Sequence, residues 1–320
     1  MNGQAATGPA RPRRGIPPTL LKELGNLELV ARTAVDGVLH GAHTTDRPGF
    51  SQEFAEYRDY VPGDDLRFVD WNAYARTDRL YLKRFEGETN TRLLVMLDVS
   101  ASMDAADGEP SAGEREGRAP RKKNPSKLVY GTWLAAALMH IALRQHDAAG
   151  LLTFNDRVQD HLPPRAGQAQ QRVLFHRLDA LSASGGSDWS TAFAHVARRL
   201  TKRGVVAAIS DFYCEPAAFG RALTMLGARG HDLIVFHLLA GAERKPRFRR
   251  NVSLRDAETG SVIEVDVNDL RHGYPRRLAD HESALRGHAG AVGAHYVRMT
   301  ADEPLDRALL GYLRFRARHP

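Results

Sequence analysis

The sequence has one cysteine, Cys214, among its 320 residues. A single thiol excludes an internal disulfide and any zinc site that needs several cysteines. Nothing in the neighbouring sequence argues for a lowered thiol pKa, so we interpret Cys214 as a small buried hydrophobic residue and not as a nucleophile. This cysteine content fits a reducing compartment.

Long apolar runs are also lacking. The longest, 233–242, is far short of the roughly 20 residues that a membrane helix needs. Residues 1–15 do not contain the apolar stretch of a secretory signal. We therefore expect a cytoplasmic protein without a membrane span.

Several motifs of enzymes are missing. The chain contains no G-x-S-x-G, no H-E-x-x-H and no G-x-x-x-x-G-K, and no G-x-G-x-x-G follows an apolar strand. These absences argue against a serine hydrolase, a zinc protease, a P-loop nucleotide site and a dinucleotide site.

The basic excess is mild, since 45 lysines and arginines against 38 acidic residues give a net charge of +7. The densest basic runs, 11–14, 121–123 and 244–250, fall in segments that we expect to be disordered or looped. A nucleic-acid binder concentrates its basic residues in one patch, so solvated charge runs are the better interpretation. Binding of nucleic acid is the weakest hypothesis, and we expect no such partner.

Three regions follow one another along the chain. Residues 1–17 predict a disordered basic tail, rich in glycine, proline, alanine and arginine. Residues 18–90 predict a helix ending near Gly37 and a β-rich module with a turn at 61–64. Residues 91–320 predict an α/β domain.

Apolar runs without alternation recur in the third region and are typical of strands buried on both faces of a parallel sheet. Segments with helical spacing separate them, which predicts a doubly wound, mostly parallel α/β sheet. A hairpin is expected within 250–267 and a disordered insertion at 104–124. The predicted strands are 93–97, 150–154, 205–209, 233–239 and 295–299, and the predicted helices are 127–145, 170–181, 189–201, 217–228, 276–288 and 304–314.

Oxygen-bearing side chains follow three of these elements. Asp98, Ser100 and Ser102 form a D-x-S-x-S run after the first strand, Ser187 precedes a helix, and Asp211 follows a later strand. Taken singly, Ser187 suits a helix N-cap, Asp211 a strand end, and the two serines a turn. Ligands bind at the carboxyl ends of strands in such sheets, and together the residues predict a site for Mg²⁺, which prefers oxygen ligands.

The three loops resemble the metal-ion-dependent adhesion site of von Willebrand factor A-like domains. The resemblance implies that Ser100, Ser102 and Ser187 bind Mg²⁺ directly, with Mn²⁺ or Ca²⁺ as alternatives. It implies that Asp98 and Asp211 act largely through water. Ser187 stands where that family usually has threonine, which keeps the hydroxyl.

An upstream run is more distinctive. It resembles the N-terminal signature of a widespread prokaryotic family of unknown function whose members join it to such an A-like domain. Genes of that family often neighbour those of MoxR-type AAA+ ATPases, which implies an adaptor or co-chaperone of such an ATPase. The same charged residues also suit a salt-bridge network around Trp71, the interpretation we prefer for them. The run comprises 49–54, 58–67, Asp70-Trp71 and Ala75-Arg76.

Two functions follow from the candidate site. The first is a non-enzymatic protein-interaction module, in which the metal binds an aspartate or glutamate of a partner. The alternative is a Mg²⁺-dependent, phosphatase-like hydrolase with Asp98 as nucleophile. That chemistry usually needs a second carboxylate two residues on, where this chain has Ser100, and a lysine that the sequence does not place.

Overall fold

The computed structural model describes residues 26–42, 56–59, 81–84, 91–105, 124–244 and 252–318. The predicted tail (1–17), the turn at 61–64 and residues 106–123 of the predicted insertion lie outside these ranges. The chain divides into one unit of residues 43–90 and another of residues 1–42 and 91–320. In the smaller unit, β1 (Glu56–Asp59) pairs antiparallel with β2 (Tyr81–Arg84).

The larger unit contains a six-stranded sheet with the order β10-β7-β6-β3-β4-β5. All neighbouring pairs are parallel except β4 with β5, which is antiparallel. The prediction of a doubly wound, mostly parallel α/β sheet is therefore confirmed. The strands are β3 (Arg92–Asp98), β4 (Ala148–Phe154), β5 (Val158–Arg165), β6 (Val205–Ser210), β7 (Asp232–Leu239) and β10 (His295–Thr300).

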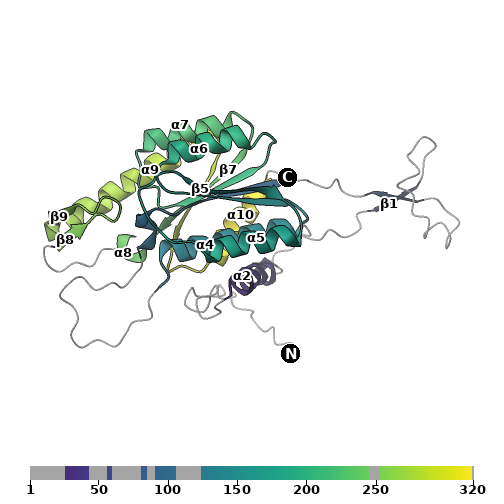
Figure 1. Cartoon of the computed structure of the whole chain (residues 1–320), viewed down its shortest axis with the longest axis horizontal. Coiled ribbons are helices and arrows are strands. Elements are labelled where there is room, and N and C mark those ends of the chain that lie inside the picture. The colour runs from purple at the N-terminus through teal and green to yellow at the C-terminus, as the bar shows by residue number, and fades with distance from the viewer. Residues whose placement is uncertain are drawn as a thin grey trace, which may run out of the picture. The chain divides into compact units, whose positions relative to one another are not determined.

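Helices cover both faces of the sheet (Figure 1). Successive residues of a strand point to opposite faces, so Val95 of β3 packs among the helices of one face and Met96 among those of the other. The first layer consists of α2 (Leu27–Ala42), α4 (Lys127–Arg144), α5 (Gln168–Asp179) and α10 (Asp306–Arg318). The second consists of α6 (Trp189–Arg199), α7 (Pro216–Gly227) and α9 (Tyr274–Ala291).

The edge strand β5 was not among the predicted strands. Its sequence is polar and carries Pro163 and Pro164, which cannot donate to a ladder and are tolerated on an edge. Gly150 of β4 explains how the strand approaches, because a Cβ there would lie only 2.6 Å from the carbonyl oxygen of Leu162.

The N-terminal helix also differs from expectation. It continues through Gly37 to Ala42, although glycine disfavours a helix interior by about 1 kcal/mol. Buried Val30 and Ala34 belong to the same core as α4, which explains why α2 groups with the α/β unit and not with the β-rich module. Packing of this apolar face compensates for the weak local propensity.

Short elements complete the larger unit near the carboxyl ends of the strands. The hairpin expected within 250–267 is formed by β8 (Val252–Arg255) and β9 (Val262–Val265). The others are a 3-10 turn (Ala101–Asp104), α8 (Gly241–Arg244) and a π-helical turn (Asp269–Gly273) before α9. Among the described residues, no helix is long and apolar enough to cross a membrane.

Candidate functional site

The strand order reverses at β3, which lies between β4 and β6. The carboxyl ends of β3 and β6 are therefore neighbours, with Leu97 opposite Ile209. Asp98 ends β3 and Ser210 ends β6, so both residues lie at the edge of the sheet where ligands of doubly wound sheets bind.

Backbone hydrogen bonds bring the loop of Ser187 to the loop after β3. The amide of Ala101 donates to the carbonyl of Gly185 at 2.9 Å, and the amide of Ser184 donates to the carbonyl of Val99 at 2.8 Å. Buried Asn155 donates from Nδ2 to the carbonyl of Ser184 at 2.8 Å. The loop is thus paired to the end of β3 like a short extra strand.

Asp98 is fully buried and accepts hydrogen bonds on both carboxylate oxygens. Oδ1 accepts from the amide of Ser100 at 2.8 Å. Oδ2 accepts from the hydroxyls of Ser187 at 2.9 Å and Ser210 at 2.7 Å. This carboxylate therefore gathers the predicted site residues around itself, and its own oxygens are already engaged.

The donor set fits a small divalent cation. The hydroxyl oxygens of Ser100 and Ser102 are 3.1 Å apart. Adjacent ligands of an octahedral Mg²⁺, each at about 2.1 Å, are separated by about 3 Å. Ser187 donates its proton to Asp98, which leaves lone pairs of its oxygen free for a metal.

Asp211 lies beside this group in a buried ion-pair network. Oδ2 of Asp211 accepts from Nζ of Lys127 at 2.8 Å, and the same ammonium contacts Oε1 of Glu243 at 2.6 Å. Burial lowers the pKa of Lys127, but Asp211 and Glu243 outweigh this and raise it overall, so the ammonium stays charged. Among the described residues, the amide of Tyr213 donates to Oδ1 of Asp211 at 3.5 Å, the upper limit of a hydrogen bond.

The electrostatics of Asp98 indicate a deficit of positive charge. Burial and the negative charge of Asp211 raise the pKa of Asp98 to about 6, against hydrogen bonds from Ser210 and Ser100 that lower it. A buried carboxylate in such surroundings favours either a proton or a cation.

The five predicted residues come together at one rim of the sheet, and metal binding by them stays a prediction.

An aromatic cluster supports the two outer loops. Trp189, which begins α6 two residues after Ser187, stacks on Phe212 with ring centroids 4.6 Å apart. Phe212 follows Asp211 and has a φ of 49°, a left-handed conformation that costs about 1 kcal/mol or more in a bulky residue. Tight packing fixes this backbone and with it the direction of Asp211.

Cys214 is half-buried and packs at the edge of this cluster. Burial, followed by the charges of Asp211 and Asp98, raises the pKa of its thiol to about 12. The thiol is therefore protonated and inert at neutral pH, which agrees with its interpretation as a small apolar residue.

The predicted metal ligands do not include Ser210, although Ser210 and Asp211 together follow the predicted strand 205–209. They also include neither Lys127 nor Glu243. Lys127 and Glu243 come from segments far apart in the chain, and only the fold brings them together. Within the described ranges, no group of three or more His, Cys, Asp or Glu residues is arranged to hold a metal, so any cation here depends on serine hydroxyls.

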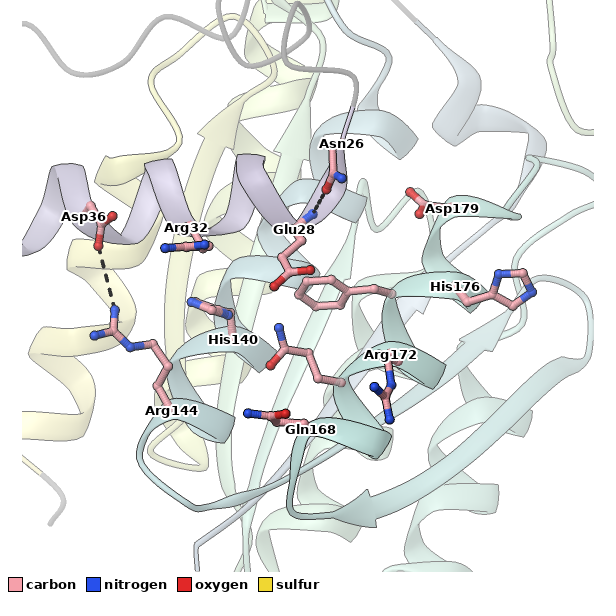
Figure 2. A pocket seen from close by; sticks show the side chains of 12 residues that line it. Asn26, Glu28, Arg32, Asp36, His140, Arg144, Gln168, Arg172, His176 and Asp179 are labelled. Atoms are coloured by element: carbon pink, nitrogen blue, oxygen red, sulfur yellow. Dashed lines mark hydrogen bonds and ion pairs between the residues drawn. The ribbon is translucent and has the colours of Figure 1, made fainter.

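A second concave region lies between α2, α4 and α5 (Figure 2). It has a volume of about 840 Å³ and is lined by Phe175 and by polar side chains of both charges. Arg144 and Asp36 pair across it at 3.8 Å, and both are half-exposed. Of its lining residues His140 and Phe175 are buried, but the charged side chains of this groove are solvated, unlike the buried Asp98, Asp211 and Lys127.

Solved structures that resemble the chain include BatB from Bacteroides thetaiotaomicron, with 15% identity, 71% of this chain and 99% of that chain covered, and a TM-score of 0.43. They also include the VWA domain of SpRpn10, which is 12% identical to this chain. That match covers 68% of this chain and 93% of the SpRpn10 domain, with a TM-score of 0.38. At these scores neither likeness bears on function.

The chain is 28% identical over 289 residues to the uncharacterized proteins Rv1480 of Mycobacterium tuberculosis and Mb1516 of Mycobacterium bovis. In each case the match covers 89% of this chain and 86% of the relative. The profile of the family described as protein of unknown function DUF58 matches residues 56–284, well over half of the sequence, and the chain therefore belongs to the DUF58 family.

Proposed function

We propose that this protein is a non-enzymatic interaction module, in which a divalent cation at Ser100, Ser102 and Ser187 binds a carboxylate of a protein partner. The observation that carries the proposal is the 3.1 Å spacing of the Ser100 and Ser102 hydroxyls beside a Ser187 hydroxyl that donates to the same buried Asp98. The cation, Mg²⁺ or alternatively Mn²⁺ or Ca²⁺, supplies a Lewis-acidic contact for an aspartate or glutamate.

The chain's own residues position that contact. Asp98 orients Ser100 by accepting a hydrogen bond from its backbone amide, and it accepts another from the hydroxyl of Ser187. The oxygen of Ser187 therefore keeps its lone pairs for a cation. Lys127 holds one oxygen of Asp211, which leaves the other for a water molecule. Ser187 is half-buried and Tyr213 is 42% exposed, so the rim of the site reaches the protein surface.

We further propose a MoxR-type AAA+ ATPase as the partner, with the protein acting as its adaptor or co-chaperone. The support is the resemblance of the residue 49–76 run to a prokaryotic family whose genes often accompany such ATPases. A carboxylate of the ATPase would complete the metal contact. Because the metal joins the two proteins, we expect a chelator to abolish their interaction.

The hydrolase alternative gains one observation from the structure. A lysine, which the sequence could not place, lies at the site as Lys127. Its ammonium is held by Asp211 and Glu243, however, and Ser100 stands where a phosphatase-like site needs an acid. Hydrolysis of p-nitrophenyl phosphate that is lost in Asp98→Asn would favour this alternative.

Thermal unfolding with Mg²⁺ or Mn²⁺, each against a chelator, tests the metal contact. Cation at 100 times its dissociation constant should stabilise the protein by about 2.7 kcal/mol. The double variant Ser100→Ala/Ser102→Ala should lose this gain, whereas Ser190→Ala, at an exposed position of α6, should keep it. An unchanged unfolding temperature in the wild type would contradict the proposal.

Capture of the ATPase tests the partner. Purified MoxR-type ATPase from the same genome should bind immobilised protein with Mg²⁺ and be released by a chelator. Ser100→Ala/Ser102→Ala should fail to capture it. Equal capture by the wild type and the double variant would contradict a metal-dependent contact.

A further inference from the structure

The tip of the β8–β9 hairpin places one more carboxylate against the candidate metal site. A Cβ built at Gly186, the residue before Ser187, would lie 3.5 Å from Oε2 of Glu258. The hydroxyl of Ser102 lies near enough to the same carboxylate to act on it. Glu258 therefore borders both the loop after β3 and the loop before α6.

Glu258 has an oxygen that the protein leaves unsatisfied. Oε1 is enclosed, and no donor within the described residues reaches it. An enclosed carboxylate oxygen without a partner is costly, and a cation at the adjacent hydroxyls would satisfy it.

The hairpin holds Glu258 in place through its turn. Oδ1 of Asp256 accepts the amides of Glu258 at 2.8 Å and Thr259 at 3.1 Å. Gly260 adopts a φ of 72°, and its amide donates to the carbonyl of Asp256 at 2.9 Å, which closes the turn. The fold of the hairpin thus fixes the backbone from which the Glu258 side chain extends.

We propose that Glu258 is a ligand of the same divalent cation and takes the coordination position that a partner's carboxylate would use. This inference rests on the proposed function. Glu258 offers the same functional group as the aspartate or glutamate expected from the partner, at the two loops that bear Ser102 and Ser187. A partner must then displace the hairpin tip, so the chain carries its own competitor for the site.

Binding of Mn²⁺ alone to the full chain tests the assignment. Calorimetric titration gives the affinity, and the relaxation of water protons by bound Mn²⁺ gives the number of coordinated waters. Glu258→Gln keeps the shape of the side chain and removes its charge. Glu264→Gln removes an exposed carboxylate from β9 of the same hairpin and is the matched control.

We expect Glu258→Gln to bind Mn²⁺ about tenfold or more weakly and to show one additional coordinated water, with wild-type behaviour for Glu264→Gln. Equal affinity and equal hydration in the two variants would overturn the role of Glu258 and leave the proposed function standing. Weaker binding with an unchanged water count would also overturn it, because the effect would then be one of charge at a distance. Absence of Mn²⁺ binding in the wild type would instead defeat the proposed function itself.

Discussion

The two ends of helix α4 show how differently charged residues are used in this protein. At the N-terminal end, Lys127 is fully buried and ion-paired with Asp211 and Glu243. At the C-terminal end, about 25 Å away along the axis, Arg144 pairs with Asp36 on an open groove. At the N-terminal end, side chains from several segments meet around Lys127, whereas the charged side chains at the C-terminal end are solvated. A specific ligand site is therefore expected at the N-terminal end.

Lys127→Met should cause the largest loss of stability. The substitution leaves the carboxylates of Asp211 and Glu243 next to each other without their cation, and breaking a buried ion pair in this way costs about 3–5 kcal/mol. Urea denaturation in the presence of a chelator measures this loss in the free energy of unfolding. Lys202→Met, at an exposed lysine, should change the free energy of unfolding by less than about 0.5 kcal/mol. A loss below 1 kcal/mol for Lys127→Met would show that this end of α4 resembles the other.

Asp98→Asn should stabilise the chelated protein at pH 7.5 by up to about 3 kcal/mol, because the folded pKa of Asp98, about 6, lies above the unfolded value of 3.8. The folded state binds the proton of Asp98 more tightly than the unfolded state does. The folded wild type therefore has its full stability below about pH 4 and loses up to about 3 kcal/mol of it as the pH rises through 6. The advantage of the variant should therefore vanish near pH 4, in denaturation curves recorded across this range. A variant that is less stable than the wild type at pH 7.5 would contradict the buried charge.

Ser187→Ala should act mainly on metal binding. It removes one hydroxyl that contacts Asp98, which costs about 1 kcal/mol without metal, and it should weaken Mn²⁺ binding by about tenfold or more. Ser187→Thr restores a hydroxyl and should recover most of the affinity in the same calorimetric titration. Equal binding by all three proteins would exclude Ser187 from the site.

Arg144→Ala should have the smallest effect. Its ion pair with Asp36 joins side chains that are 55% and 51% exposed, and such pairs contribute roughly 0–1 kcal/mol. Asp36→Asn should give a similarly small change in urea denaturation. A loss of more than about 1 kcal/mol for either variant would show that the groove is more tightly integrated than its exposure indicates.

The sequence was sufficient for five of the six strands of the sheet and for the convergence of Asp98, Ser100 and Ser187. Runs such as 93–97 and 205–209 are short and apolar throughout, which is typical of strands buried on both faces of a parallel sheet. Topology then brings their carboxyl ends together. The sequence therefore connects the D-x-S-x-S run to Ser187 and Asp211.

Other parts could not be predicted because their determinants are not local. The polar strand β5 has no apolar pattern, since one of its sides faces solvent at the edge of the sheet. Helix α2 extends past Gly37 because tertiary packing outweighs local propensity. Lys127 and Glu243 occur in unremarkable local sequence, and they pair across 116 residues.

The stacking of Trp189 on Phe212 gives the protein a built-in optical reporter. The indole is 4% exposed and joins the segment of Ser187 to the segment of Asp211 through one aromatic contact. Any rearrangement of either segment alters the surroundings of this ring. Fluorescence emission from Trp189 should therefore report the binding of a cation at the candidate metal site without an added label.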